Sequence, residues 1–178
     1  MSTTSWLSFS TARSVDALGY GYSWSNPTNV LIQDGNVTSW FTVEPGTYSD
    51  YLYVEGPVLP SIPNNAIIDG IEVRLYRKTF TFDTNYVADQ RIFLLINDTP
   101  VGTNQSLGDI WTPNSYTWDT FGNSSSLWGY GGNITIADID SNFGFYISGV
   151  TSGNAIPNLD CAQIRFTYSY DTKFFITL

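Results

Sequence analysis

The segment Ile67–Lys78, with the sequence IIDGIEVRLYRK, constrains the fold of this chain more than any other stretch. From Asp69 onward its apolar and polar side chains alternate, which is the two-residue period of a half-buried β-strand. The apolar members are Ile71, Val73 and Leu75. Because such a strand needs a second sheet against its apolar face, we expect a layered β structure with these three side chains in the core.

The polar face of the same segment carries a concentration of charge. Arg74, Arg77 and Lys78 are three of the seven cationic residues of the chain. A solvated sheet surface is the simplest explanation, and isolated exposed ion pairs contribute only about 0–1 kcal/mol each. The alternative, which we carry forward as a prediction, is that these three cations contact a neighbouring subunit.

Further alternating segments are separated by Gly, Pro and Asn, which mark turns between strands. One short helical turn is expected where Thr135 precedes Asp138, because this spacing resembles a capping box. Many short strands with almost no helix predict an all-β fold, a single antiparallel β-sandwich. The additional strands are expected over residues 40–43, 48–55, 87–97, 116–118, 143–148 and 162–170.

The strand that contains Ile92–Ile96 differs from the others because it is apolar on both faces. Ile92 and Leu94 share one face with Ile96, whereas Phe93 and Leu95 lie on the other. A strand of this kind is either covered on both sides or part of a subunit interface. We therefore add Phe93 and Leu95 to the predicted interface.

The expected domain organisation is simple. Residues 1–25, rich in Ser, Thr, Gly and Tyr, form an N-terminal arm that lies along the domain or docks on a neighbour. Residues 26–171 form the sandwich, and residues 172–178 form a C-terminal tail. The first residues lack a basic segment followed by an apolar core, so no signal peptide is expected, and we expect synthesis in a cytoplasm.

Charge limits the partners that this chain can bind. Sixteen acidic and seven basic residues give a formal net charge of −9. Such a balance opposes binding to a phosphate backbone or to an anionic membrane surface. Nucleic acid and membrane are therefore not expected as partners.

The chemistry available to the chain is also limited. There is no histidine and a single cysteine, Cys161, which excludes His-based triads, His-based and thiolate zinc sites and an intrachain disulfide. No phosphate-binding glycine loop follows a strand, and we expect no enzyme activity, no cofactor and no metal. Two alternatives use carboxylates: calcium at Asp138 and Asp140, and a glycosidase pair. The glycosidase candidates are Asp83, Asp89, Asp109 and Asp119, although loop aspartates more often cap turns.

Aromatic side chains supply the one positive indication of a binding function. The chain has six Trp and twelve Tyr residues, more than the core of a small sandwich requires. Sugars and protein partners are both bound by such rings, which combine apolar area with a hydrogen-bonding group. The candidates for an aromatic ligand platform are Trp24, Trp40, Trp111 and Trp118.

Several short motifs occur in an order and spacing that are moderately specific. They are WSNPTN (24–29), LPSIPNNAIIDGIEVRLYRK (59–78), VADQRIFLLI (87–96), VGTN (101–104), SSSLWG (124–129) and TIADIDSNFGFYIS (135–148). This succession resembles a jelly-roll-like β-sandwich family found among bacteriophage virion structural proteins. The resemblance covers residues 24–170 and leaves out the N-terminal segment and the tail.

The resemblance implies a non-enzymatic component of a virus particle that acts as a homo-oligomer such as a trimer. It implies a capsid decoration or cement protein whose partners are the major capsid or tail proteins. The alternative is a tail or fibre module that binds a host-surface glycan through exposed Trp and Tyr side chains.

Overall fold

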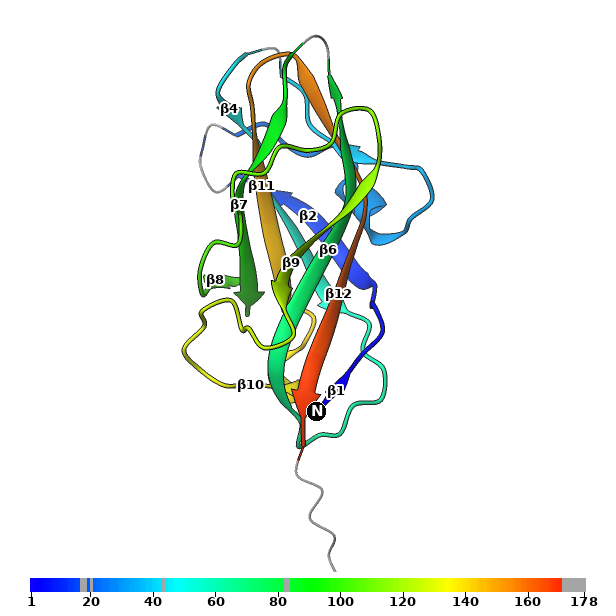
Figure 1. Cartoon of the computed structure of the whole chain (residues 1–178), viewed down its shortest axis with the longest axis vertical. Coiled ribbons are helices and arrows are strands. Elements are labelled where there is room, and N and C mark those ends of the chain that lie inside the picture. The colour runs from blue at the N-terminus through cyan, green and yellow to red at the C-terminus, as the bar shows by residue number, and fades with distance from the viewer. Residues whose placement is uncertain (17–18, 20, 43, 82–83, 171–178) are drawn as a thin grey trace, which may run out of the picture.

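The two longest strands, β6 (Ile67–Thr81) and β12 (Ala155–Ser169), pair antiparallel along the length of the molecule (Figure 1). Their register brings Glu72 opposite Arg165 and Arg74 opposite Gln163. The structure is a computed structural model that describes residues 1–16, 19, 21–42, 44–81 and 84–170. The predicted strand at Ile67–Lys78 is thus confirmed, and it runs three residues further, to Thr81.

The remaining strands complete a sandwich of two six-stranded sheets. In the first sheet β12 and β6 are joined by β1 (Ser2–Thr3), β3 (Thr38–Ser39), β9 (Thr117–Asn123) and β10 (Ile134–Thr135). The second sheet has the order β2-β5-β11-β7-β8, with β4 beside β11. Its strands are β2 (Phe9–Val15), β4 (Thr47–Tyr48), β5 (Tyr51–Pro57), β7 (Val87–Ile96), β8 (Thr99–Val101) and β11 (Gly144–Thr151). All the paired strands are antiparallel, which confirms the predicted fold class: an all-β, jelly-roll-like antiparallel β-sandwich.

The core lies between the two sheets and contains the side chains that the alternation predicts. Ile71, Val73 and Leu75 of β6 are fully buried. They belong to one apolar cluster with inward residues of the second sheet such as Ile92 and Leu94. Period-two patterning therefore identified the inner faces of the strands correctly.

The expected N-terminal arm is part of the sandwich over most of its length. Ser2–Thr3 pairs with β12, and Phe9–Val15 pairs with β5, so the first 15 residues contribute a strand to each sheet. The two alternatives for this segment were packing along its own domain and docking on a neighbour. These strands pack along their own domain. The expected C-terminal tail, 172–178, lies outside the described residues.

The described residues contain two short 3-10 helices, one more than predicted. The turn at η2 (Ile136–Asp138) is the expected one, and the Asp138 carboxylate accepts hydrogen bonds from the backbone N–H and the hydroxyl of Thr135. The turn at η1 (Pro27–Leu31) begins with a proline at its first position, where a missing N–H has no cost. The strand expected at 40–43 is reduced to an isolated bridge between Thr42 and Ala155, and residue 43 lies outside the described residues.

Candidate binding surface

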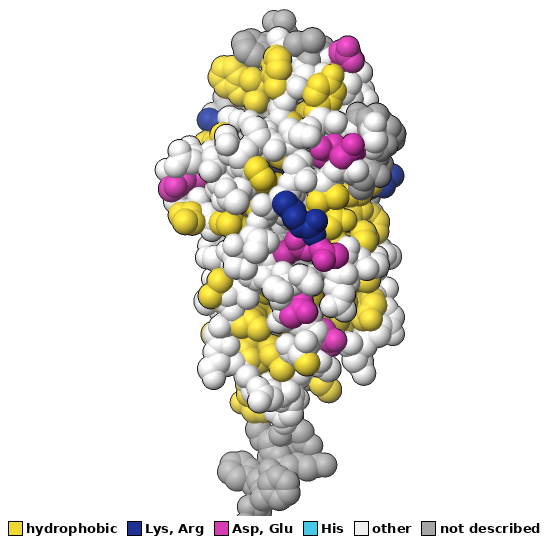
Figure 2. All heavy atoms as spheres, turned by 180° about the vertical axis from the view of Figure 1, so that it is seen from behind, with side chains coloured by type: hydrophobic (Ala, Val, Ile, Leu, Met, Phe, Trp, Pro, Cys, Tyr) yellow, Lys and Arg dark blue, Asp and Glu magenta, His cyan; other side chains and the backbone are white. Residues whose placement is uncertain are grey.

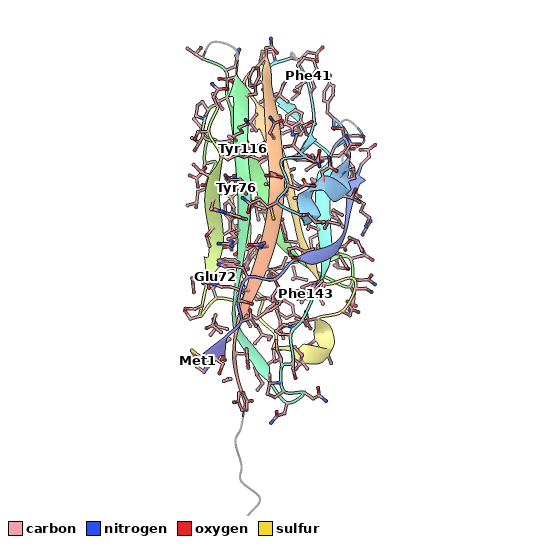
Figure 3. The ribbon with its side chains drawn as sticks, turned by 90° about the vertical axis from the view of Figure 1, so that its right-hand side faces the viewer. Met1, Phe41, Glu72, Tyr76, Tyr116 and Phe143 are labelled. Carbon is pink, nitrogen blue, oxygen red and sulfur yellow. The ribbon has the colours of Figure 1, made fainter. Side chains whose placement is uncertain are left out.

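The outer face of the first sheet carries a row of alternating aromatic and cationic side chains. Three members come from β6, whose outward positions are set by the same alternation that buries Ile71, Val73 and Leu75. Figure 3 shows Tyr116, Tyr76 and Glu72 following one another along this face. We call the set the aromatic row; its members are Trp6, Arg74, Tyr76, Lys78, Tyr116, Trp118 and Arg165, all partly exposed.

Tyr76 lies at the centre of the row. Its ring stacks on that of Tyr116, with centroids 5.0 Å apart and an interplanar angle of 22°. On the other side the Trp118 ring lies 5.0 Å away at 33°. Tyr76 and Trp118 are direct cross-strand partners in β6 and β9, so their side chains point to the same face.

Arg74 lies between two tryptophans. Its guanidinium carbon is 4.1 Å from the Trp118 ring centroid and 4.4 Å from that of Trp6, which are cation–π distances. Its Nε donates to Oε1 of Gln163 at 2.8 Å, a neutral partner. Burial lowers the pKa of Arg74 from its usual value, and the positive charge of Arg165 lowers it further.

The two ends of the row differ in how their cations are held. Arg165 also lies over the Trp6 ring, with a centroid distance of 4.5 Å, and donates two hydrogen bonds of 2.7 Å to the Glu72 carboxylate. These bonds raise the pKa of Arg165. Lys78 lies 4.4 Å from the Tyr116 ring centroid and forms no ion pair with the carboxylates of the described residues.

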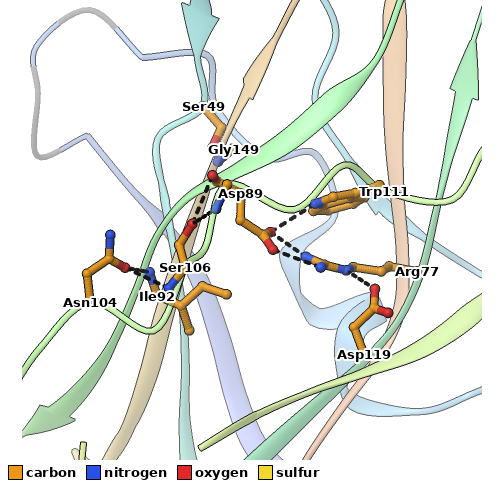
Figure 4. Close-up of polar contacts among 10 residues, drawn as sticks. Ser49, Arg77, Asp89, Ile92, Asn104, Ser106, Trp111, Asp119 and Gly149 are labelled. Atoms are coloured by element: carbon orange, nitrogen blue, oxygen red, sulfur yellow. Dashed lines mark hydrogen bonds and ion pairs between the residues drawn. The ribbon is translucent and has the colours of Figure 1, made fainter.

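A cleft of about 590 Å³ adjoins the row along β9. Loop residues between 104 and 109 form one wall, and residues 118–122 of β9 form the other. Trp118 therefore belongs to both the cleft and the row. The loop wall is anchored on β7: the Ile92 N–H donates to Asn104 Oδ1 at 2.8 Å, and the Ser106 hydroxyl donates to the Asp89 carbonyl at 2.9 Å (Figure 4).

Behind this cleft, a buried charge network holds Arg77 (Figure 4). Arg77 is 1% exposed and makes a two-pronged ion pair with Asp89, in which Nη2 lies 2.8 Å from Oδ2. Its Nε donates to the Asp119 carboxylate at 2.7 Å. Although burial alone would lower the pKa of Arg77, the two carboxylates outweigh it and raise the pKa. Trp111 closes the network, with its Nε1 donating to Asp89 at 2.9 Å.

The prediction that Arg77 contacts a neighbouring subunit is therefore wrong. Arg77 follows Ile71, Val73 and Leu75 at the two-residue period, so it points inward. Arg74 and Lys78 do lie on the outer face, as predicted. Whether they contact another subunit stays a prediction.

Three of the four predicted platform tryptophans are buried. Trp24, Trp40 and Trp111 are 3%, 2% and 0% exposed, so they cannot form a surface platform. Trp24 Nε1 donates to the backbone carbonyl of Asp50 at 2.9 Å, and its ring packs edge-on against that of Trp40. Of the four, only Trp118 lies on the surface.

The outer face of the second sheet carries a smaller apolar cluster. Tyr146 is stacked between the rings of Tyr51 and Phe93, with centroids 4.4 Å and 5.6 Å away. Leu95 is fully buried in this cluster, so the prediction that its side chain contacts a neighbouring subunit is wrong. Phe93 is partly buried, and its contact with another subunit stays a prediction. Figure 2 views the molecule from behind and shows basic side chains at the middle of the face, with acidic ones directly below.

A polar cleft of about 500 Å³ lies on this second face. Arg13 donates to Glu55 at 3.1 Å, forms an ion pair with Asp98, and lies 4.7 Å from the Tyr53 ring centroid. Burial raises the pKa of Glu55, although Arg13 opposes this shift. Arg13 is therefore paired with two carboxylates, whereas none of the ion pairs in the described residues involves Arg74.

Four members of the aromatic row were not predicted as site residues: Trp6, Tyr76, Tyr116 and Arg165. The outward position of Tyr76 on β6 was a usable signal, and so was the alternation of Arg165 with Ile164 on β12. Trp6 lacked such a signal because its place depends on the pairing of the preceding residues with β12.

The carboxylates that were considered for chemistry lie in different places. Asp89 and Asp119 both bind Arg77, Asp109 is an exposed residue of the cleft loop, and Asp83 lies outside the described residues. Asp138 caps η2 instead of pairing with Asp140. Within the described ranges, no three Asp, Glu or Cys side chains gather into a possible metal site. The same ranges contain no helix long and apolar enough to cross a membrane.

Comparison with known proteins gives distant likenesses only. No protein-family model and no curated protein matches the chain. Among solved structures, one similar chain is a Family 16 Carbohydrate Binding Module-2 (13% identity, 83% of this chain and 86% of that chain, TM-score 0.36). Another is TmCBM61 in complex with β-1,4-galactotriose (15% identity, 88% and 89%, TM-score 0.37). A third is the CBM22-1 xylan-binding domain from Paenibacillus barcinonensis Xyn10C (15% identity, 88% and 93%, TM-score 0.30). No inference is drawn from likenesses at these TM-scores, and the resemblance to virion proteins stays a prediction.

Proposed function

We propose that this chain is a non-catalytic carbohydrate-binding β-sandwich that holds an extended glycan along the aromatic row. The observation that carries the proposal is the set of four partly exposed rings on one sheet face: Trp6, Tyr76, Tyr116 and Trp118. Aromatic rings offer flat apolar area to the C–H face of a sugar, and the polar neighbours offer hydrogen bonds to its hydroxyl groups.

The shape and charge of the surface favour this ligand over others. The row is open and follows β6, which suits a chain-like ligand better than a small molecule that needs enclosure. Rings beside cations also suit single-stranded nucleic acid, but such a ligand needs a continuous cationic groove along its backbone. Among the described residues, Arg74 and Lys78 are the two cations of the row without an ion pair, which are too few for such a groove. The adjoining cleft extends the contact area on the Trp118 side.

A glycan array followed by fluorescence titration tests the proposal. Trp6 and Trp118 are the partly exposed tryptophans, so a bound glycan should change their emission while the buried tryptophans stay constant. Trp118→Ala should weaken the affinity by about tenfold or more, as expected for a central aromatic contact.

Phe41→Ala is the matched control, because Phe41 is an aromatic side chain that is 53% exposed at the upper end of the molecule in Figure 3, away from the row. This variant should bind like the wild type. A wild-type protein that binds no glycan, or a Trp118→Ala variant that binds normally, contradicts the proposal.

The second candidate is the virion role that the sequence resemblance implies, with a capsid or tail subunit as the partner. Two observations favour it. Leu107 and Ile110 are 85% and 59% exposed on the loop beside the cleft, and a partner would cover such apolar side chains. Trp, Tyr and Arg, the residues of the row, are also enriched in protein interfaces.

Native mass measurement and co-sedimentation with particles separate the two candidates. A homo-oligomer such as a trimer that binds particles and is inert to sugars supports the virion role. Leu107→Ser should then weaken particle binding and leave the fold intact. A monomer that binds glycans and no particle contradicts it.

A further inference from the structure

Arg74 is a partly desolvated cation without a carboxylate partner. In the part of the chain that the structure describes, the ion pairs involve Arg13, Arg77 and Arg165, and none involves Arg74. Its guanidinium lies between the rings of Trp6 and Trp118 and donates to the neutral amide of Gln163. Lys78 and Arg91 also lack an ion pair among the described residues, but each lies over a tyrosine ring and not between two tryptophans.

The nearby carboxylates are already engaged. Glu72 accepts two hydrogen bonds from Arg165, and Asp119 accepts one from buried Arg77. Asp160 is 3% exposed and accepts the backbone N–H groups of residues 34 and 35. The charge of Arg74 therefore remains available to a ligand.

Arg74 also keeps hydrogen-bond donors. A guanidinium has five N–H groups, and those on Nε and Nη2 that point at Gln163 Oε1 account for two of them. The planar group matches the geometry of a carboxylate or a sulfate. Lys78, at the Tyr116 end of the row, is a second cation without an ion pair among the described residues.

We propose that the aromatic row selects acidic polysaccharides, with a carboxylate or sulfate of the glycan bound by Arg74 and a second acidic group near Lys78. This inference rests on the proposed carbohydrate-binding function and adds the class of glycan. The sugar rings pack on Trp6, Trp118 and Tyr76, while the acidic groups take the place of the missing counter-ion. The exposed Asp109 in the cleft loop directs the acidic groups toward the Arg74 side of Trp118.

Two pairs of matched glycans test the charge requirement. Oligogalacturonate is compared with its fully methyl-esterified form, which has the same backbone and no charge, and dextran sulfate is compared with dextran. The wild type should bind the acidic member of at least one pair about tenfold more tightly or better, as a charge-assisted hydrogen bond predicts. Which pair responds distinguishes carboxylate from sulfate. The preference should weaken as the salt concentration rises.

Variants assign the preference to Arg74. Arg74→Gln should abolish it, whereas Arg74→Lys, which keeps the charge without the planar fork, should retain part of it. Arg91→Gln is the control, because Arg91 lies on the second sheet, where it donates to the Tyr51 hydroxyl. The Arg91→Gln substitution changes the net charge by the same amount as Arg74→Gln. This variant should keep the full preference, and thermal melts check that all three variants fold.

The outcomes separate this inference from the proposed function. Equal binding of the two members of both pairs, or a preference that survives in Arg74→Gln, overturns the acidic selectivity and leaves carbohydrate binding standing. Binding of neutral glycans alone has the same meaning. If no glycan of either kind binds the wild type, both proposals fall.

Discussion

Arg74 and Arg77 are three residues apart in one strand, and they hold their charges in opposite ways. Arg77 points into the molecule, where Asp89 and Asp119 pair with it and Trp111 packs on its guanidinium. Arg74 points outward between Trp6 and Trp118, and its polar partner among the described residues is the Gln163 amide. The odd spacing is the cause, because neighbouring positions of a strand alternate between its faces.

Arg77 carries a structural charge, whereas the charge of Arg74 is available for binding. A buried cation must have carboxylate partners, because an unpaired charge away from water is very costly. A cation at the surface can remain without one, since solvent and ring faces partly stabilise it. Arg74 can therefore lack a carboxylate partner in a stable fold, and its charge stays free for a ligand.

The largest expected effect is on stability and follows from removing the buried cation. Arg77→Met leaves Asp89 without its cation and should lower the free energy of unfolding by about 3–5 kcal/mol. Arg74→Met, the same substitution on the other face, should lower it by about 1 kcal/mol or less. Urea unfolding of both variants measures the difference.

A double variant tests the cause of that loss. In Arg77→Met with Asp89→Asn, the residual buried charge is gone, so part of the lost stability should return. If Arg77→Met costs no more than Arg74→Met, the buried network is not a structural charge cluster and the comparison fails.

The next largest expected difference in stability is between variants of the two tryptophans beside these arginines. Trp111→Phe removes the indole N–H that donates to Asp89 and leaves a small void, so it should lower the free energy of unfolding by about 1–3 kcal/mol. Trp118→Phe keeps a ring on the surface and should change the stability by about 0.5 kcal/mol or less. Urea unfolding again measures both, and equal losses would mean that Trp118 is as structural as Trp111.

Much of the fold follows from local patterning, which a sequence displays directly. The alternation predicted strands over 67–78 and 162–170, which the structure extends to Ile67–Thr81 and Ala155–Ser169. It also predicted the inward positions of Ile71, Val73 and Leu75, which the structure confirms. The helical turn at Asp138 was also local, because its cap lies three residues away. The same period placed Arg77 inward, and grouping it with Arg74 and Lys78 by charge overrode that signal.

The binding surface was less predictable because it is assembled from distant segments. Trp6, Arg74, Trp118 and Arg165 meet only through strand pairing, which no local pattern shows. Residue type alone misassigned the other tryptophans. Trp24 and Trp111 find carbonyl or carboxylate acceptors inside the protein, so their indole N–H groups can be buried without loss.

The smallest expected effect concerns Cys161, which lies in β12 directly opposite Tyr76 of the neighbouring strand β6. Burial raises the pKa of its thiol to about 11, with a further contribution from Asp160, while Arg74 opposes the shift. Between the ordinary thiol pKa of 9.0 and about 11, the folded state holds a proton that the unfolded state has lost. Stability should therefore fall as the pH rises through this window, by an amount of order 1 kcal/mol once solvent screening is considered.

Cys161→Ala removes this titration and should flatten the decline in stability between pH 9 and 11, as urea unfolding across that range measures. A slope at higher pH should persist in the variant, because burial also raises the pKa of Tyr146 to about 12. Arg74→Gln should extend the decline to higher pH, since it removes the positive charge that favours the thiolate. If Arg74→Gln leaves the pH range of the decline unchanged, the charge of Arg74 is already compensated, and the contrast between the two arginines loses its electrostatic basis.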